Sequence, residues 1–384
     1  MISGEYPAVV TYPGLPMRVR KVGAPLGVII LLGTVAGLIV IGLTALNPVG
    51  TAIGFVLSSV AMTVVLLAYL WLDRWEPEPP RLLVLAFLWG ASVAVVVSVI
   101  LGLYIETLIS SGETETISPA SVVIGAPMIE EAAKGLFLLL MMTGRRRNEL
   151  NSMTDCLVYA GIAAAGFTWL EDILYIGGGE SLGDSLLTAA MRLVMAPFAH
   201  SLFTTAFGIG VYFALQRRNV IGKVGCILLG YIGAVFMHGL WNGSSLLSVE
   251  AYFGVYLLWM VPIFGLAIWL GIASRRREQR LVAAKLPGMV AAGLVTPNEA
   301  TWLGSIRNRK LAIDQATRLG GRPAGKSVKK FAAQVVELAF VRDRIDRGFG
   351  DARVHALQQD EVNGVAASRA TTPMLQTLAG YRGP

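Results

Sequence analysis

Carboxylates and imidazoles lie inside four successive apolar stretches of this 384-residue chain. Glu130 and Glu131 lie near the middle of the first stretch, Glu171 in the second, His200 in the third and His238 in the fourth. A carboxylate beside a pair of histidines can activate water, either directly as a general base or through a bound metal ion. If the stretches pack together, these residue types can therefore support hydrolysis.

A metal ion is one option for this set of residues. A catalytic zinc site needs three protein ligands and a water molecule. Either Glu130 or Glu131 could join His200 and His238, and we take Glu130, His200 and His238 as the candidate ligands. The HExxH signature of soluble metalloproteases is absent, so zinc is compatible with the sequence but not required by it.

Two polar residues follow the candidate residues at helical spacing. Lys134 comes four residues after Glu130, and Asn242 four residues after His238, so each pair shares one face of its helix. Lys134 would place a positive charge beside the glutamates, and Asn242 could donate a hydrogen bond to a developing oxyanion. A plainer reading makes Glu130 and Lys134 an ion pair that only holds helices together, and makes Glu131 a residue that orients Lys134.

Three neighbouring residues are expected to support the site or to lie near it and not to take part in the reaction. Phe167 is expected to support the site by packing against it. Asp172 lies close to an aqueous interface, where hydration alone would account for a carboxylate. Arg192 precedes Pro197 by about one helical turn, and is as readily a counter-ion as an anchor for a substrate.

The stretches that position these residues are predicted membrane spans. The chain is 54% hydrophobic and 15% charged, whereas soluble domains carry about 25% charged residues. Its apolar residues form uninterrupted blocks long enough to cross a bilayer core of about 30 Å. A carboxylate at the centre of such a helix costs about 2.5–3.5 kcal/mol on insertion scales, so Glu130 and Glu131 should face a bundle interior. We therefore expect an all-α, polytopic transmembrane bundle.

The apolar blocks predict about eight spans. Their expected ranges are 25–46, 51–72, 82–109, 120–143, 153–176, 185–215, 222–247 and 252–273. The sixth range is long for a simple span, which predicts tilt or a helical extension.

Basic clusters in the loops predict the orientation. The clusters are Arg18, Arg20 and Lys21; Arg145, Arg146 and Arg147; Arg217 and Arg218; and Arg275, Arg276 and Arg277. With eight spans and both termini in the cytoplasm, all of them lie inside, as the positive-inside rule requires. The opposite loops, 110–119 and 177–184, contain no Lys or Arg. Membrane orientation thus explains the net charge of +7, and we expect no nucleic-acid partner.

The composition divides the chain into three parts. We expect a cytoplasmic tail at 1–24, the transmembrane bundle at 25–273 and a charged, Ala-rich cytoplasmic region at 274–384. Within the last part, Lys326 to Arg347 has apolar residues at helical spacing. This segment predicts a small helical domain or an amphipathic helix on the membrane surface. The plainer reading of the whole region is a partly ordered regulatory or oligomerising tail. The oligomeric state is left open.

Four ordered motifs resemble the PrsW family of intramembrane proteases. They are EExxK at Glu130, Glu131 and Lys134; FxxxE at Phe167 and Glu171; His200 within AHSLFT; and HGLWN from His238 to Asn242. The loop Asp73-Arg74-Trp75-Glu76-Pro77-Glu78-Pro79 resembles the family as well. The family is related to the CAAX-prenyl endopeptidase and bacteriocin-processing superfamily, with its EExxxR, FxxxH and HxxxN motifs.

The resemblance implies roles for these residues. Glu130 would activate the hydrolytic water, Glu171, His200 and His238 would be ligands or proton-handling partners, and Asn242 would help to hold the oxyanion. It also implies a bacterial plasma-membrane enzyme that cuts a single-span membrane protein, of the anti-sigma-factor kind, on its outer side. Members are described as metalloproteases, while a metal-free glutamate mechanism is argued for their relatives. The chain departs from the family in Asp172, where Asn is more usual, and in its long basic tail.

A different class of function uses the same residue types. Intramembrane Glu and His residues also form proton relays, so a proton- or ion-coupled transporter is the alternative. Transporters often contain inverted repeats and paired broken helices. Only a short Ala-Pro pattern, at Ala126-Pro127 and Ala196-Pro197, resembles a repeat here, which favours the protease.

Overall fold

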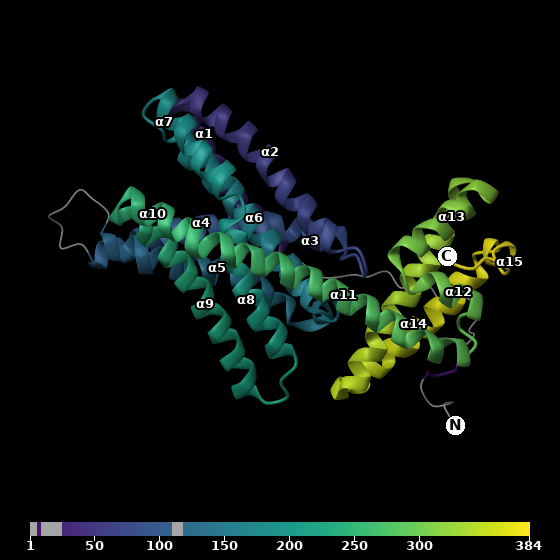
Figure 1. Ribbon diagram of the computed structural model, residues 1–384. Coiled ribbons are helices and arrows are strands. Elements are labelled where there is room, and N and C mark those ends of the chain that lie inside the picture. Colours follow the sequence, from purple (N-terminus) through teal and green to yellow (C-terminus); the bar gives the residue numbers. More distant parts are fainter. Residues whose placement is uncertain (1–5, 9–24, 110–117) are drawn as a thin grey trace. The chain divides into compact units, whose positions relative to one another are not determined.

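The structure is a computed structural model that describes residues 6–8, 25–109 and 118–384 (Figure 1). In these ranges the regular elements are all helices and no strand occurs, which confirms the all-α prediction. The predicted basic cluster at Arg18, Arg20 and Lys21, most of the predicted tail at 1–24 and most of the predicted loop 110–119 lie outside the described residues.

The described residues form two compact units, which we treat separately. The membrane unit consists of residues 25–73 and Glu78–Ile272. The C-terminal unit includes Arg74–Pro77 and Ala273–Pro384. The boundary near residue 273 falls inside one long helix. The composition of the sequence changes at this point, but the helix continues across it without a break.

Seven helical segments in the described part of the chain are long and apolar enough to cross a membrane. They are Leu26–Leu46, Pro48–Leu72, Pro80–Leu108, Met153–Gly177, Leu182–Leu215, Val220–Leu247 and Val249–Ala291. Each overlaps one of the spans expected from the sequence. The chain is thus a multi-pass membrane protein, and the side of the membrane that each terminus faces stays a prediction from the loop charges.

The fourth expected span is helical but is not among these seven. It consists of a π-helical turn, η2 (Ser121–Gly125), followed by α5 (Ala126–Met141). At about 1.5 Å per residue, the two together reach roughly 30 Å, the thickness of a bilayer core. Glu130, Glu131 and Lys134 lower its apolarity, so the residues that suggest chemistry also weaken the hydrophobic signal of the span.

Short connections divide the remaining elements of the membrane unit. The helices are α1 (Leu26–Leu46), α2 (Pro48–Leu72), α3 (Pro80–Leu88), η1 (Trp89–Ala94), α4 (Val95–Ile109), η3 (Gly144–Glu149), α6 (Met153–Gly177), α7 (Leu182–Ala189), η4 (Ala190–Met195), α8 (Ala199–Leu215), α9 (Val220–Leu247), α10 (Val249–Val255), η5 (Tyr256–Met260) and α11 (Val261–Ala291). The long sixth span is thus broken between η4 and α8 at Pro197. That break lies three residues before His200.

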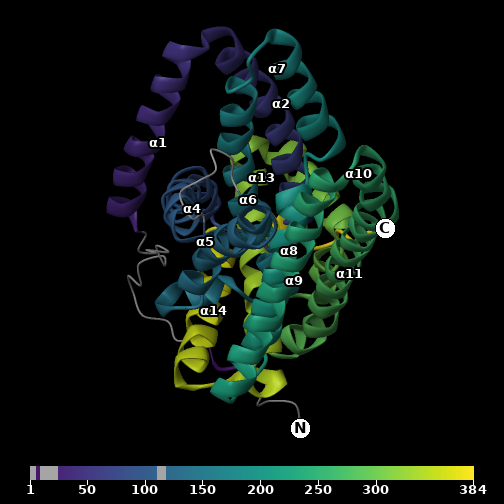
Figure 2. The ribbon, with the colours of Figure 1, turned by 90° about the vertical axis from the view of Figure 1, so that its left-hand side faces the viewer.

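Helix α6 runs through the middle of the membrane unit (Figure 2). It packs against α2, α3, η1, α5 and α8, and nearly all of its side chains are buried. Its small residues permit backbone contact with its neighbours. A Cβ atom on Gly166 would lie 2.0 Å from the carbonyl oxygen of Phe87, and one on Gly90 would lie 1.8 Å from that of Ala163. This close approach fixes the position of α6 along its axis relative to α3 and η1, and hence the positions of Phe167 and Glu171.

Polar caps hold both ends of α6. Ser152 and Asp155 form a reciprocal capping box at its start, which satisfies backbone N–H groups that lack helical partners. At its other end, the side-chain amide of Asn47 donates to the carbonyl oxygens of Gly177 and Gly179, each at 3.0 Å. The α1–α2 turn therefore anchors the end of α6 that lies nearest to Glu171.

The C-terminal unit has a hydrophobic core of its own. Its elements are the end of α11, α12 (Pro297–Leu303), α13 (Ile306–Arg344), η6 (Ile345–Phe349), α14 (Ala352–Ala370) and α15 (Met374–Thr377). Phe331, Val335 and Leu338, on the apolar face of Lys326 to Arg347, are buried in that core. This packing supports a small helical domain rather than a helix lying on the membrane. Gly321 interrupts α13 with a φ of 74°, a conformation that L residues with a side chain rarely adopt.

Asp73 predicts a pH dependence of stability. It follows α2, is 6% exposed, and accepts a hydrogen bond from the backbone N–H of Glu78 at 2.9 Å. Burial raises the pKa of Asp73 to about 8, with a smaller contribution from the charge of Asp155. The unfolded value is about 3.9. Between these values the folded chain binds more protons than the unfolded chain, so the free energy of unfolding falls as pH rises.

The Asp73→Asn variant tests this dependence. Asparagine can accept the same hydrogen bond and does not titrate, so we expect its unfolding midpoint to change less between pH 5 and pH 8 than that of the unmodified chain. The difference should amount to a few degrees in a thermal unfolding scan in detergent. Parallel pH dependences of the two proteins would contradict the expected protonation of Asp73.

Candidate active site

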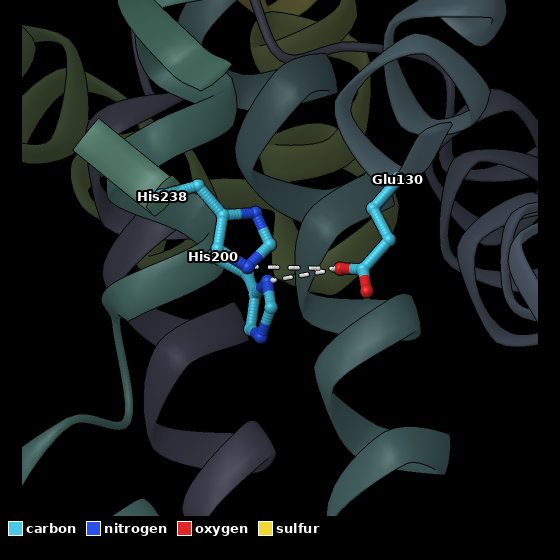
Figure 3. A group of neighbouring side chains, drawn as sticks. All are labelled: Glu130, His200 and His238. Carbon is cyan, nitrogen blue, oxygen red and sulfur yellow. Dashed lines mark ion pairs between the residues drawn. The ribbon is translucent and has the colours of Figure 1, made fainter. Parts of the chain in front are cut away.

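Three side chains from three helices converge in the membrane unit (Figure 3). Glu130 comes from α5, His200 from the first turn of α8 and His238 from α9. The Glu130 Oε2 atom lies 3.8 Å from Nε2 of His238 and 4.0 Å from Nδ1 of His200. Atoms of these three residues lie within 4.8 Å of one another, which is compatible with shared coordination of a metal ion. The structure thus brings together the three residues expected to lie side by side.

Behind His238 lies Glu131. Its Oε1 atom is 3.1 Å from Nδ1 of His238 and 2.8 Å from Nζ of Lys134, and its Oε2 accepts a hydrogen bond from Thr204 at 2.7 Å. These partners place the proton of a neutral His238 on Nδ1, since Nδ1 faces a carboxylate. The Nε2 atom, directed toward Glu130, is then free to accept.

Exposure separates the two adjacent glutamates. The Glu130 side chain is 13% exposed, whereas that of Glu131 is fully buried. Glu131 has partners on both oxygens, which leaves it no free face toward a substrate. The geometry therefore supports Glu130 as the reacting carboxylate and Glu131 as a residue that orients His238 and Lys134.

A second carboxylate lies behind His200. Oε2 of Glu171 is 2.8 Å from Nε2 of His200, on the side of the ring that faces away from Glu130. A neutral His200 therefore carries its proton on Nε2, and Nδ1 accepts from Nζ of Lys134 at 3.0 Å. Phe167 packs against the same ring, with 5.3 Å between centroids, as its expected supporting role requires.

Lys134 occupies the centre of this network. Its side chain is fully buried, and its Nζ lies 2.8 Å from Glu131, 3.5 Å from Glu130 and 3.0 Å from Nδ1 of His200. It also lies 4.0 Å from the centroid of the Phe167 ring. A buried ammonium needs such partners because an unpaired charge in a low-dielectric interior is costly. The expected Glu130–Lys134 pair is present, but Glu131 makes the closer contact.

The expectation of a hydrated Asp172 is wrong for the described structure. Its side chain is fully buried, and Oδ1 accepts from Nε of Arg192 at 2.5 Å. Nη2 of the same Arg192 contacts Oε2 of Glu171, also at 2.5 Å. The Arg192 side chain reaches from η4 to both carboxylates of α6, and Asp172 is enclosed by protein instead of water. Arg192 is thus a counter-ion to two carboxylates.

Asn242 stands apart from the carboxylate cluster. Its Nδ2 donates to the carbonyl oxygen of Val122 at 3.1 Å. That carbonyl belongs to the π-helical turn before Pro127, and the proline has no N–H with which to continue the helical ladder. Gly239 allows this approach, since a Cβ atom there would lie 2.5 Å from the carbonyl oxygen of Val123. One N–H of the Asn242 amide thus supports the backbone, and its second N–H is available for another acceptor.

A cavity of about 490 Å³ gives access to the cluster. Glu130, Glu171, His200, His238 and Asn242 all line it, together with apolar side chains. Pockets of this kind, mostly apolar with a few convergent polar groups, are typical of binding sites.

Two residues of this network had little or no signal in the sequence. Thr204, which binds Glu131, lies four residues after His200 and so shares its helix face; that spacing could have identified it. Arg192 was noted only as a counter-ion or an anchor for a substrate, and its two partners on α6 are known only from the tertiary structure. No spacing rule links it to Glu171 and Asp172.

Comparison with known proteins identifies the family. Residues 78–268 match the description "PrsW family intramembrane metalloprotease". Protease PrsW of Geobacillus kaustophilus is 26% identical over 224 residues, which cover 58% of this chain and 91% of the relative. Protease PrsW of Oceanobacillus iheyensis is 23% identical over 213 residues, which cover 54% of this chain and 93% of that relative. No solved structure matches the chain.

These matches agree with one another and with the geometry. The matched residues include Glu130, Glu171, His200 and His238, so the similarity covers the convergent cluster. Both relatives are proteases, and the transporter hypothesis is not favoured. Because the family description covers the segment that contains the site and both relatives are named Protease PrsW, the chain belongs to the PrsW family of intramembrane proteases.

Proposed function

We propose that this protease hydrolyses a peptide bond of a single-span membrane protein with a water molecule activated by Glu130. The observation that carries the proposal is the 3.8 Å separation between Oε2 of Glu130 and Nε2 of His238. Both atoms are acceptors in the arrangement described above. A water molecule that donates to both of them turns a lone pair of its oxygen toward the cavity, where a carbonyl carbon can be attacked.

The reaction then needs one proton to be moved twice. Glu130 takes a proton from the water while the water oxygen bonds to the carbonyl carbon and the carbonyl oxygen becomes negative. Glu130 next gives that proton to the amide nitrogen as the C–N bond breaks, which leaves a carboxylic acid and an amine. The second N–H of Asn242 donates to the oxyanion, and His238 holds the water in place.

The residues of the cluster fit a zinc ion in donor type but not in charge. The donor types fit, because two imidazoles and a carboxylate form a catalytic zinc set and each imidazole has a carboxylate behind it. The charge does not fit, because Lys134 donates to Nδ1 of His200, the nitrogen that would bind the metal, and also lies 3.5 Å from Glu130. A divalent ion there would displace or repel a buried ammonium. We therefore propose direct activation by Glu130, with no metal-dependent step.

The substrate side follows from the family and from the cavity. A membrane protease implies a membrane-protein substrate in a lipid environment. The mostly apolar cavity suits an unwound stretch at the end of a transmembrane helix. We propose a single-span protein of the anti-sigma-factor kind, cut on its outer side, as the substrate, and the bacterial plasma membrane as the location. The relatives from two bacterial species support the location.

A reconstituted cleavage assay tests the proposal. The purified chain, treated with a chelator, is placed in liposomes with a set of single-span reporter proteins that carry a different tag on each side of the span. We expect a cut inside or just outside the span of at least one reporter. The cleavage rate should not fall after chelation, and the preparation should contain less than one zinc ion per chain. Mass spectrometry of the fragments locates the bond, and a parallel ion-uptake measurement tests the transporter alternative.

Each outcome decides between defined alternatives. Ion-dependent uptake without any cleavage would overturn the protease proposal. Cleavage that stops on chelation and returns with one zinc ion per chain would retain the protease and overturn the direct role of Glu130 in water activation. Matched reporters with a charged residue at every position of the span do not insert readily into the bilayer. If these reporters remain uncut, cleavage needs an inserted substrate.

A further inference from the structure

Arg192 is the cation nearest to the open side of the site. It lies in η4, four residues before the helix breaks at Ala196, and its side chain is 27% exposed at the cavity. Its guanidinium group reaches back to α6, where it contacts Glu171 and Asp172 through different nitrogen atoms. It also stacks on the ring of Tyr175, 4.3 Å from the centroid. Three residues of one helix therefore fix its position.

The two contacts of Arg192 with carboxylates are not equivalent. Asp172 binds Arg192 with Oδ1, and its Oδ2 is buried without a partner among the described residues. Glu171 binds Arg192 and His200 with the same oxygen, Oε2. Asp172 therefore connects Arg192 to no further residue of the cluster, whereas Glu171 connects Arg192 to His200.

A shared oxygen makes the imidazole orientation depend on the arginine. The guanidinium holds Oε2 of Glu171 in one place, and the His200 ring turns its Nε2 toward that place at 2.8 Å. This directs Nδ1 of His200 toward Lys134 and Glu130, at 3.0 and 4.0 Å. Without Arg192 the Glu171 side chain could adopt other rotamers, and the His200 ring could follow it.

We propose that Arg192 is a positioning residue, which orients His200 through Glu171 and does not bind the substrate. The proposal rests on the function proposed above, because it needs the cluster of Glu130, His200 and His238 to be the reacting one. It separates the two readings left open by the sequence, a counter-ion or a substrate anchor. A positioning residue affects the rate of the chemical step, whereas an anchor affects substrate binding.

Arg192→Gln and Asp172→Asn distinguish these roles. Both variants remove the ion pair between Arg192 and Asp172, although the asparagine of Asp172→Asn can still accept a hydrogen bond, and only Arg192→Gln releases Glu171. Steady-state kinetics are measured with the reporter that the unmodified chain cleaves, together with thermal unfolding in detergent. For Arg192→Gln we expect kcat to fall about 10- to 100-fold, the usual effect of removing a residue that orients a functional imidazole, with KM changed less than about twofold. For Asp172→Asn we expect kcat to stay within about threefold.

Three further variants complete the experiment. Arg192→Lys keeps the charge but not the two-armed geometry, so it should recover part of the lost kcat if Glu171 alone needs a partner. Arg217→Gln removes an exposed arginine after α8 and should leave kcat unchanged. Added methylguanidinium should raise the kcat of Arg192→Ala, because it can occupy the space beside Glu171.

Several results would overturn the proposal. A rise in KM at unchanged kcat would make Arg192 a substrate anchor. Equal losses in Arg192→Gln and Asp172→Asn, matched by equal losses of thermal stability, would make it a link that only holds η4 to α6. Full activity of Arg192→Gln would leave it no role. Failure of the proposed function is distinguishable, since it would appear as full activity of Glu130→Gln with the same reporter.

Discussion

Replacing Glu130 by Gln is expected to abolish measurable cleavage while the protein stays folded. The amide keeps the size of the side chain but cannot take a proton from water, and general-base catalysis contributes about 10²- to 10⁴-fold. Glu130 is 13% exposed at the cavity, and its shortest ionic contact is the 3.5 Å one with Lys134, so the change breaks no short ion pair. Single-turnover cleavage of the reporter, with thermal unfolding of the same preparation, measures both effects.

Glu180→Gln is the matched control for Glu130→Gln. Glu180 is an exposed glutamate in the turn between α6 and α7, so the same chemical change there should leave the rate unchanged. Glu130→Asp adds a finer test, because it keeps the base but withdraws it by one methylene from His238. We expect a partial loss for that variant. Unchanged cleavage by Glu130→Gln would exclude Glu130 as the base.

Replacing Gly166 by Ala is expected to cause a large loss of stability. Its new Cβ atom would lie 2.0 Å from the carbonyl oxygen of Phe87, and 2.8 Å from the carbonyl carbon of the same residue. These are backbone atoms, so the clash can be relieved only by moving α3 away from α6. Such overpacking typically costs about 1–3 kcal/mol, occasionally more. Cleavage should fall as well, because Phe167 and Glu171 follow Gly166 on the same helix.

Gly37→Ala makes the same substitution where space is free. Gly37 lies inside α1, and nothing lies within 4 Å of the position of its added Cβ. Alanine is a better helix former than glycine by about 1 kcal/mol, so this variant should be at least as stable as the unmodified chain. Thermal unfolding in detergent compares the two variants. A Gly166→Ala protein as stable as Gly37→Ala would show that α3 and α6 are not in backbone contact.

The sequence by itself determined the class of fold and the three residues of the convergent cluster, Glu130, His200 and His238. Long uninterrupted apolar blocks are unfavourable in water and favour insertion into a bilayer. Inside the bilayer the backbone N–H and C=O groups must hydrogen-bond to one another, so helices were expected. Carboxylates in those blocks cannot face lipid, which required that Glu130 and Glu131 face the interior of the bundle. The convergence of Glu130 with His200 and His238 followed from the same cost.

Only the tertiary structure decided how the residues of the site divide their roles. Spacing within a helix shows which side chains share a face, but not which face of a neighbouring helix they meet. The sequence therefore paired Glu130 with Lys134, whereas the packing of α8 and α9 gave Glu131 the shorter contacts and left Glu130 at the cavity.

Packing also determined the hydrogen-bond partners of Asp172 and Asn242. Proximity to an interface suggested water around Asp172, but the side chain is buried and Arg192 of η4 is its partner in place of water. Asn242 shares a helix face with His238, yet the carbonyl of Val122 takes one of its N–H groups because Pro127 leaves the backbone there without a helical donor. The cost of burying a polar group is fixed by the sequence, while the partner that offsets it depends on which helices meet.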